Sequence, residues 1–213
     1  MSLNKDRGTL FVVSGPSGAG KGTIINEYFK KYKDDKVFLS ISATTRAPRE
    51  GEVDGVNYYY KSQAEFEKMI LEKDFLEWAT FCGNYYGTPK SAVEKMLDDG
   101  IDVILEIEVQ GAMKVRAMMP EGIFVFVLPP SFEELRNRII GRNTETLDVI
   151  NERLNTAKKE ISQIDNYNYI LLNDNVVDAV DRLNAIICAE RCRLERNTNI
   201  IGEMKNDDLS FNQ

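Results

Sequence analysis

The clearest chemical motif of the chain is a glycine-rich segment near its N-terminus. Residues 15–23 read Gly-Pro-Ser-Gly-Ala-Gly-Lys-Gly-Thr, which fits the phosphate-loop pattern G-x-x-x-x-G-K between an apolar strand candidate and a helix candidate. Glycines let backbone N–H groups point at phosphate oxygens, and the helix N-terminus adds partial positive charge. A plain strand–turn–helix corner would not require Lys21. The segment predicts a nucleoside triphosphate site formed by Gly15, Pro16, Ser17, Gly18, Ala19, Gly20, Lys21, Gly22 and Thr23.

One position of this loop departs from the usual pattern. Gly22 follows Lys21 where Ser or Thr is usual, and the first hydroxyl group belongs to Thr23. Adenylate kinases resemble the chain here, with a Gly-Lys-Gly-Thr sequence. In such loops a hydroxyl group contacts the Mg²⁺ ion that accompanies ATP. We therefore expect Thr23 to contact Mg²⁺, and the sequence leaves open whether it does so directly or through water.

A second candidate site lies in an extended, proline-containing segment, residues 42–52. Arg46 and Arg49 are three residues apart there, and Pro48 biases Ala47 away from helix. Because a planar guanidinium group binds phosphate bidentately, the two arginines could clamp a small anionic acceptor. They could equally be solvated surface charges. These residues alone leave both interpretations open.

The composition excludes several classes of site. The chain has no His, which removes Ser-His-Asp triads, most zinc sites and histidine acid–base chemistry. Its 27 Lys and Arg against 34 Asp and Glu give a charge of −7, so we expect no nucleic-acid partner. The three cysteines lack metal-site spacing and are expected to be buried or half-buried thiols. Without a long apolar run or a signal-peptide pattern, we expect a cytoplasmic protein with no membrane partner.

The elements that must position these residues alternate along the chain. Apolar runs bounded by turn residues predict strands at 9–14, 37–42, 102–107, 123–128 and 169–172. Helical periodicity predicts helices at 20–32, 63–71, 90–98, 109–118, 131–140, 147–164 and 176–196. This alternation is typical of an α/β fold with a mainly parallel sheet and helices on both faces.

Two stretches interrupt the alternation. Residues 42–90 are rich in Tyr, Gly, Thr and Arg, and they contain short β-like pieces around glycine turns, which suggests a small inserted subdomain. Residues 132–163 form two charged helices around a polar loop and suggest a mobile cap.

Taken together, the motifs resemble guanylate kinases. The resemblance covers about residues 8–196 and implies a three-layer P-loop kinase with a central, mainly parallel sheet, an inserted small mixed α/β subdomain that binds GMP, and a helical lid. It divides the chain into a core (1–40, 92–131 and 164–196), a GMP-binding subdomain (41–91), a lid (132–163) and a flexible tail (197–213). The motifs are residues 42–52, Glu77-Trp-Ala, Gly83-Asn-Tyr-Tyr-Gly-Thr, Leu105-Glu-Ile-Glu-Val-Gln-Gly and Gly141-Arg-Asn-Thr-Glu.

The resemblance also assigns residues to the acceptor. The positions that match those holding the GMP phosphate are Ser42, Arg46, Arg49, Tyr58 and Tyr86. Glu77, Thr88 and Glu106 match positions around the base, and Glu108 stands where the family more often has Asp. Guanine offers two adjacent donors, N1–H and the N2 amino group, to a carboxylate such as Glu77, while a hydroxyl such as Thr88 can donate to O6. Tyr59, Tyr85 and Trp78 are expected to pack instead.

The resemblance further identifies residues of the lid and the adenine side. Arg138 and Arg142 match lid arginines, and Arg153 is assigned to the same set, although all three could be ordinary helix-surface charges. Asn173 matches a family Asn near the adenine pocket. The candidate catalytic residues are therefore Lys21, Arg46, Arg138, Arg142 and Arg153.

The resulting expectation is an enzyme, with ATP and GMP as its small-molecule partners. It would transfer the γ-phosphoryl group of ATP in line to GMP, and to dGMP as well, with Mg²⁺ as cofactor and an arginine lid that closes. A monomer and a homodimer are both open. The alternatives are a kinase for another nucleoside monophosphate and a non-catalytic phosphopeptide-binding module. Glu77 with Thr88 argues against the first, and the intact phosphate loop together with Arg138 and Arg142 argues against the second.

Overall fold

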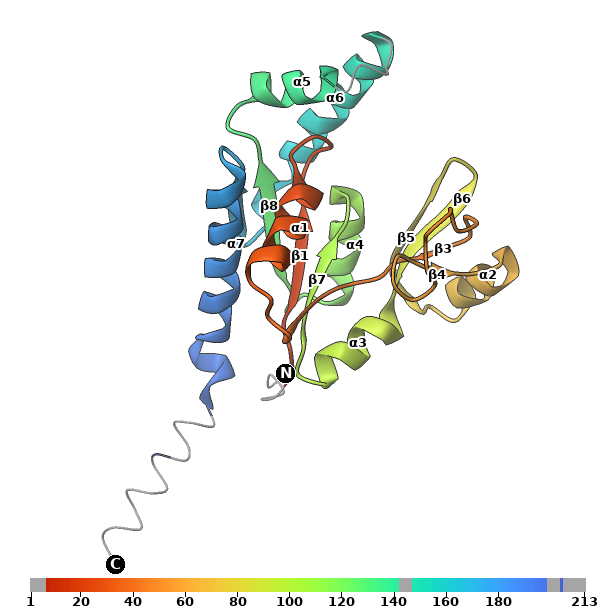
Figure 1. The fold of residues 1–213 in the computed structure, drawn as a ribbon, viewed down its shortest axis with the longest axis vertical. Coiled ribbons are helices and arrows are strands. Elements are labelled where there is room, and N and C mark those ends of the chain that lie inside the picture. The colour runs from red at the N-terminus through yellow and green to blue at the C-terminus, as the bar shows by residue number, and fades with distance from the viewer. Residues whose placement is uncertain (1–6, 142–146, 199–203, 205–213) are drawn as a thin grey trace, which may run out of the picture.

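The computed structural model describes residues 7–141, 147–198 and 204, which form two β-sheets and the helices around them (Figure 1). The larger sheet has the strand order β2-β7-β1-β8-β9, and every neighbouring pair is parallel. The expected mainly parallel sheet is thus confirmed. Its strands are β1 (Leu10–Ser14), β2 (Val37–Leu39), β7 (Asp102–Glu106), β8 (Ile123–Leu128) and β9 (Tyr169–Leu172).

Helices cover both faces of this sheet because its central strands are apolar on both sides. On β1, Phe11 and Val13 pack toward α1 (Lys21–Lys31) and α7 (Val176–Arg191). Leu10 and Val12 pack toward α3 (Lys90–Asp98) and α4 (Val109–Met118). Each such buried side chain stabilises the fold by roughly 1.5–3 kcal/mol. Two cores separated by one sheet make the expected three layers.

The smaller sheet is formed by strands within residues 43–89, in the order β4-β3-β6-β5. The pair β3/β4 is parallel, and β3/β6 and β5/β6 are antiparallel. Phe66 of α2 stacks on Phe75 and Tyr85, and Tyr59 packs against the same cluster, which confirms the packing expected of Tyr59 and Tyr85. The elements are β3 (Ala43–Thr44), β4 (Tyr59–Tyr60), α2 (Gln63–Leu71), β5 (Phe75–Phe81) and β6 (Asn84–Pro89).

Two helices, α5 (Phe132–Ile140) and α6 (Leu147–Ile161), stand beyond the carboxyl ends of the parallel strands (Figure 1). They share a small core of their own made of Leu135, Ile139, Ile150, Leu154 and Ala157. The helices therefore form a separate lobe, which we call the lid. Short 3₁₀ turns at Ile164–Asn166 and Leu194–Arg196 follow α6 and α7.

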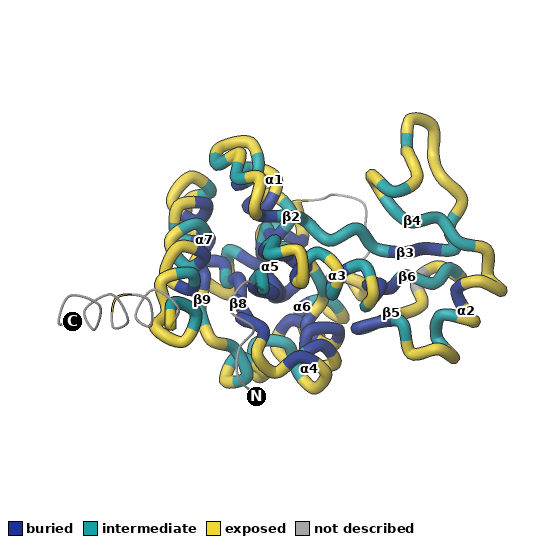
Figure 2. The backbone as a smooth tube through the Cα atoms, turned by 90° about the horizontal axis from the view of Figure 1, so that it is seen from below, coloured by how far each residue is buried: buried dark blue, intermediate teal, exposed yellow. Residues whose placement is uncertain are grey.

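Some expectations about the elements were wrong. The strand expected at 37–42 ends at Leu39 because the chain then crosses to the smaller sheet, which it enters at Ala43. The cysteines are exposed rather than buried. Cys82 lies in a turn. Helix α7 has a buried and an exposed side (Figure 2), and Cys188 is not among its buried residues. Within the described ranges, we find no helix whose length and hydropathy would suit a membrane span.

Candidate active site

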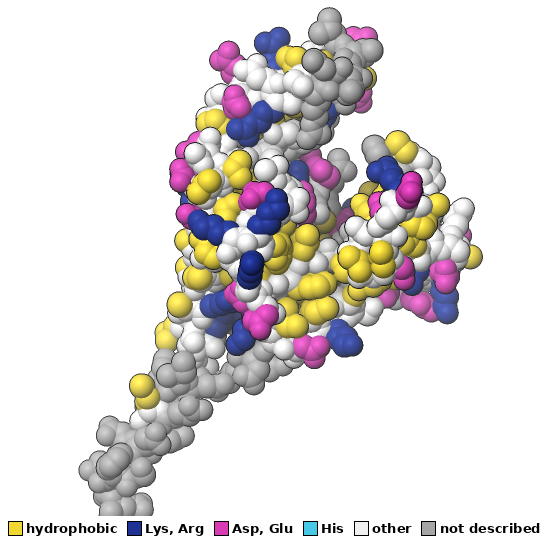
Figure 3. Space-filling model, in the orientation of Figure 1, with side chains coloured by type: hydrophobic (Ala, Val, Ile, Leu, Met, Phe, Trp, Pro, Cys, Tyr) yellow, Lys and Arg dark blue, Asp and Glu magenta, His cyan; other side chains and the backbone are white. Residues whose placement is uncertain are grey.

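A cavity of about 570 Å³ lies where the sheets and the lid meet. Figure 3 shows the molecule hollowed between the lid at the top and the lobe of the smaller sheet at the right. Parallel strands place their carboxyl ends at one edge, which is the usual ligand edge of an open α/β sheet. The expected site residues that line this cavity are Ser17, Ser42, Glu77, Tyr86, Glu106, Glu108 and Arg153.

The phosphate loop forms the strand-to-helix turn between β1 and α1. Gly15 and Gly20 have φ angles of 145° and 93°, which favour glycine. A side chain at either position would also collide with its surroundings, since a Cβ atom at Gly15 would lie 2.4 Å from the Val127 carbonyl oxygen and one at Gly20 would lie 2.3 Å from Asn173 Nδ2. These backbone conformations turn the chain directly from β1 into the N-terminus of α1, where backbone N–H groups can bind an anion.

Lys21 begins α1 and is only 7% exposed. Its ammonium group donates to the Gly15 carbonyl oxygen at 2.6 Å and lies 3.6 Å from Glu108 Oε1. Lys21 is therefore held between the phosphate loop and the acidic edge of the cavity, within reach of both.

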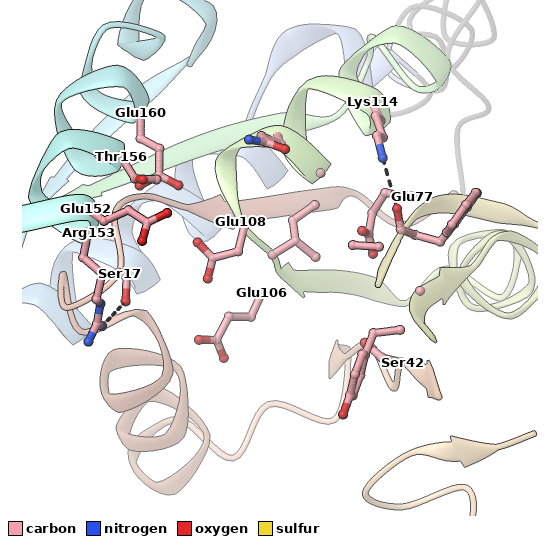
Figure 4. A pocket seen from close by; sticks show the side chains of 17 residues that line it. Ser17, Ser42, Glu77, Glu106, Glu108, Lys114, Glu152, Arg153, Thr156 and Glu160 are labelled. Atoms are coloured by element: carbon pink, nitrogen blue, oxygen red, sulfur yellow. Dashed lines mark hydrogen bonds between the residues drawn. The ribbon is translucent and has the colours of Figure 1, made fainter. Parts of the chain in front are cut away.

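The acidic edge of the cavity consists of Glu106, Glu108 and Glu160 (Figure 4). Glu106 is solvent accessible, yet the cavity walls desolvate it enough to raise its pKa despite the nearby Lys21. Burial and the neighbouring Glu108 raise the pKa of Glu160 to about 7. A Cβ atom at Gly22 would lie 3.1 Å from Glu106 Oε1, so the unusual glycine leaves room for this carboxylate.

A cluster of arginine, glutamate and tyrosine lies on the side of the smaller sheet and reaches the cavity through Tyr86. Arg46 Nη2 donates to Glu52 Oε1 at 2.9 Å, and the guanidinium carbon lies 5.4 Å from the centre of the Tyr58 ring. Tyr58 contacts Tyr86 edge to face, with ring centres 6.1 Å apart. The hydrogen bond from Arg46 is the main reason that the pKa of Glu52 falls to about 2, and the pKa of Arg46 is raised by the same contact. Tyr60 also donates to Glu52, at 2.8 Å.

The expected base-reading pair meets across the β5/β6 hairpin, where Glu77 lies opposite Thr88. The Thr88 hydroxyl, in a residue only 1% exposed, donates to Glu77 Oε1 at 2.8 Å. In this arrangement Thr88 orients the carboxylate, which differs from the expected donation to a base. Burial raises the pKa of Glu77, against the effects of Thr88 and Lys114.

The lid contacts the phosphate loop directly through Arg153 and indirectly through Asn173, the residue after β9. Arg153 of α6 donates to the Ser17 hydroxyl at 2.6 Å (Figure 4). Arg138 of α5 donates to the Asn173 carbonyl at 3.1 Å, and the Asn173 side-chain amide donates to the Ala19 carbonyl at 2.7 Å. Asn173 therefore holds the loop itself. Arg142 lies outside the described residues.

Two other expected site residues, Arg49 and Thr23, are not among the residues that line the cavity. The Arg49 side chain is exposed, and its backbone N–H donates to Glu52 at 2.7 Å. Thr23 is exposed on the first turn of α1. Trp78, expected to pack, is 36% exposed and meets Tyr85 edge to face.

Comparison with known proteins identifies the family to which the chain belongs. The family model described as guanylate kinase matches residues 7–190. A guanylate kinase of Halalkalibacterium halodurans is 55% identical over 91% of this chain and 94% of its own length. A guanylate kinase of Caldanaerobacter subterraneus subsp. tengcongensis is 53% identical over 98% of this chain and 100% of its own length. This chain belongs to the guanylate kinase family.

The fold agrees with that family. A crystal structure of guanylate kinase from Anaplasma phagocytophilum superposes with a TM-score of 0.69 at 33% identity and covers 90% of both chains. The chain is therefore an enzyme of the phosphotransferase class, and the resemblance noted in the sequence is confirmed.

Several residues of this guanylate kinase site were missed by sequence reasoning. Glu152, Thr156 and Glu160 of α6 line the cavity. They are four residues apart and so share one face of the helix, a spacing that is visible in the sequence. Lys114 lines the opposite wall three residues after Gly111 on α4. Glu52 accepts from the predicted Arg46 and from Tyr60, and so belongs to the same cluster.

Proposed function

We propose that this chain transfers the γ-phosphoryl group of ATP to the phosphate of GMP inside the cavity between the sheets and the lid. ATP would lie against the phosphate loop, and GMP against the smaller sheet. The observation that carries the proposal is that one cavity is lined by Ser17 of the phosphate loop at one side and at the other by Glu77, which accepts a hydrogen bond from Thr88.

Glu77 supports guanine as the base. Ionised, it offers two acceptor oxygens to the adjacent N1–H and N2–H₂ donors of guanine. Adenine presents a lone pair at N1, which would leave a desolvated carboxylate facing an acceptor. A site of this kind can reject the wrong base by about 10⁴-fold. Because the deoxy sugar leaves the base unchanged, dGMP should be accepted too.

The acceptor phosphate would bind to Ser42, Arg46, Arg49, Tyr58 and Tyr86. A phosphate monoester has a second pKa of about 6, so it is largely dianionic at neutral pH and needs little help from a general base. Its nucleophilicity fits a chain without His. Arg46 and Arg49 would hold the acceptor in line for attack, which is the main requirement of phosphoryl transfer.

The donor side suits a Mg²⁺–ATP complex. Thr23, Glu106 and Glu108 offer the hard oxygen ligands that Mg²⁺ prefers. The described residues contain no group of three acidic or other ligating side chains fit to hold a metal ion, so phosphate oxygens should supply most ligands. When bound, Mg²⁺ neutralises charge on the phosphates. Lys21 would reach the β- and γ-phosphates, and the loop residues 15–23, apart from Pro16, would bind the phosphates through backbone N–H groups, with Asn173 behind them.

The lid would complete the site. Arg138 and Arg153, together with Arg142 outside the described residues, would stabilise charge on the transferring group. Closing of the lid would exclude water and so suppress hydrolysis of ATP. In the predicted division of the chain, the core (1–40, 92–131, 164–196) would bind ATP and the GMP-binding subdomain (41–91) would bind GMP. The lid (132–163) would close over both.

The test is ADP release from Mg²⁺–ATP with GMP, AMP, CMP or UMP as the only acceptor. We expect release with GMP alone. In Glu77→Gln, the KM for GMP should rise by about tenfold or more and discrimination against AMP should fall, because one acceptor oxygen is replaced by a donor. Glu72→Gln, at an exposed position on the end of α2, is the matched control. Unchanged GMP/AMP discrimination in Glu77→Gln would refute the base-reading role.

A further inference from the structure

We propose that Lys114 is a specificity-determining positioning residue, whose positive charge keeps the Glu77 carboxylate ionised in the base pocket. The inference rests on the proposed function, because it concerns the carboxylate that reads guanine. It adds a residue of the core helix α4 to the Glu77–Thr88 pair of the smaller sheet.

The geometry places Lys114 beside this carboxylate. Helix α4 packs so closely on β5 that a Cβ atom at Gly111 would lie 3.1 Å from Glu77 Oε2. Lys114 follows one turn later on the same face of α4. Its ammonium group donates to the carbonyl oxygen of Trp78, the next residue after Glu77, at 3.0 Å (Figure 4). Both Lys114 and Glu77 line the cavity.

Glu77 needs such a partner because its surroundings disfavour charge. Desolvation is the largest influence on its pKa and raises it. The hydrogen bond from Thr88 and the charge of Lys114 both act in the opposite direction. A protonated carboxyl group would carry a hydrogen on one oxygen and could not accept from both guanine donors.

Of the two cations among the described residues that line the cavity, Arg153 donates to Ser17 of the phosphate loop, and Lys114 is the one whose charge lowers the pKa of Glu77. From β6, Glu77 meets Thr88, which is neutral. Glu106 and Glu108 at the end of β7 line the same cavity, but their negative charge would favour protonation of Glu77. Bound guanine would remove further water from the carboxylate and so increase the need for a positive charge.

Lys114 could instead be only a structural tie between α4 and β5, through its bond to the Trp78 carbonyl. Three variants separate the two roles. Lys114→Arg keeps the charge and the donor, whereas Lys114→Gln keeps a donor without the charge. Lys68→Gln, at an exposed site on α2, removes the same charge elsewhere.

The first measurement is the KM for GMP of the full chain from about pH 6 to about pH 8.5, a range that also spans the second pKa of the GMP phosphate. Removing the positive charge raises the Glu77 pKa, so the carboxyl group becomes neutral at higher pH. We expect Lys114→Gln to raise KM by about three- to tenfold near pH 6 and by less near pH 8, with little change in kcat. Lys114→Arg and Lys68→Gln should follow the wild type. Titration of GMP itself cancels in the ratio to wild type.

The second measurement is the carbon-13 NMR titration of the Glu77 carboxyl group without nucleotide, assigned with Glu77→Gln. We expect its pKa to rise in Lys114→Gln but not in Lys114→Arg. A pH-independent increase in KM with an unchanged Glu77 titration would overturn the inference and leave a structural tie. A wild-type chain without GMP-dependent turnover would refute the proposed function instead, and the titration would still decide the role of Lys114.

Discussion

At the scale of single residues, the arginine and tyrosine cluster beside the smaller sheet is organised around one carboxylate. Three donors converge on Glu52: the Arg46 guanidinium group, the backbone N–H of Arg49 and the Tyr60 hydroxyl group. These bonds fix the loop that carries Arg46 and Arg49, the two arginines predicted to clamp the acceptor phosphate. Glu52 is therefore suited to pre-organise the arginines rather than to touch the substrate.

We predict that Glu52→Gln raises the KM for GMP by about three- to tenfold, because charge-assisted hydrogen bonds are replaced by weaker neutral ones. The KM for ATP should stay unchanged, since the phosphate loop is elsewhere in the cavity. Steady-state kinetics with each substrate varied in turn checks this. Glu50→Gln, at an exposed position two residues earlier, is the control. A lower KM for GMP would mean that Glu52 competes with the acceptor phosphate for Arg46.

Sequence alone could not single out Glu52 or Lys114 for these roles. The phosphate loop is local, so residues 15–23 could be recognised from spacing and chemistry. Glu52, by contrast, gains its importance when a six-residue loop folds back on Arg46, and Lys114 gains it when α4 packs on β5. Neither contact follows from helix or strand periodicity.

At the scale of elements, the phosphate loop depends on the end of β9. Asn173 is 3% exposed and joins the loop to the lid, because its amide binds the Ala19 carbonyl and its own carbonyl accepts from Arg138. The last strand of the sheet thus supports the turn after the first strand. A substitution at the end of β9 should therefore alter the phosphate loop and the ATP binding proposed for it.

Asn173→Ala should therefore weaken both the fold and ATP binding. The Ala19 carbonyl would lose its buried partner, at a cost of about 1–3 kcal/mol in the free energy of unfolding. The KM for ATP should rise, while the KM for GMP should not. Urea denaturation and steady-state kinetics measure the two effects, with Asn184→Ala on the half-buried side of α7 as control. Equal changes in both KM values would argue against a local effect on the loop.

The elements themselves were largely predictable, and the misses have a physical cause. The bounds of α2, α3 and α4 match the expected ranges because amphipathic periodicity is local. The two-residue strands β3 and β4 exist only through their pairing with distant segments, so no periodicity marks them. The predicted division of the chain into core, subdomain and lid stays a prediction.

At the scale of the whole molecule, chemistry and anchoring lie at opposite edges of the large sheet. Glu106 ends β7 at the cavity, whereas Asp102 begins it at the other edge. There Arg191 Nε donates to Asp102 at 2.7 Å, and Arg191 Nη1 donates to Asp34 at 2.8 Å. Asp102 also accepts from the Thr9 backbone N–H. This cluster ties the end of α7 to three other segments without touching the active site.

Arg191→Met should lower stability and leave turnover unchanged. Asp102 is 5% exposed, so removing its partner leaves a buried charge and costs about 2–4 kcal/mol at neutral pH. Burial acts to raise the pKa of Asp34, but its hydrogen bonds from Arg191 and the Lys36 N–H lower it overall. The stability that Asp34 contributes is present above the pKa of the unfolded state and is lost as pH falls through the folded-state value. The difference between wild type and variant, measured by urea denaturation, should thus be largest near neutral pH and shrink in acid.

Arg182→Met, which breaks an exposed pair with Asp174, should cost much less at every pH. A loss of kcat in Arg191→Met would contradict this separation of the two edges.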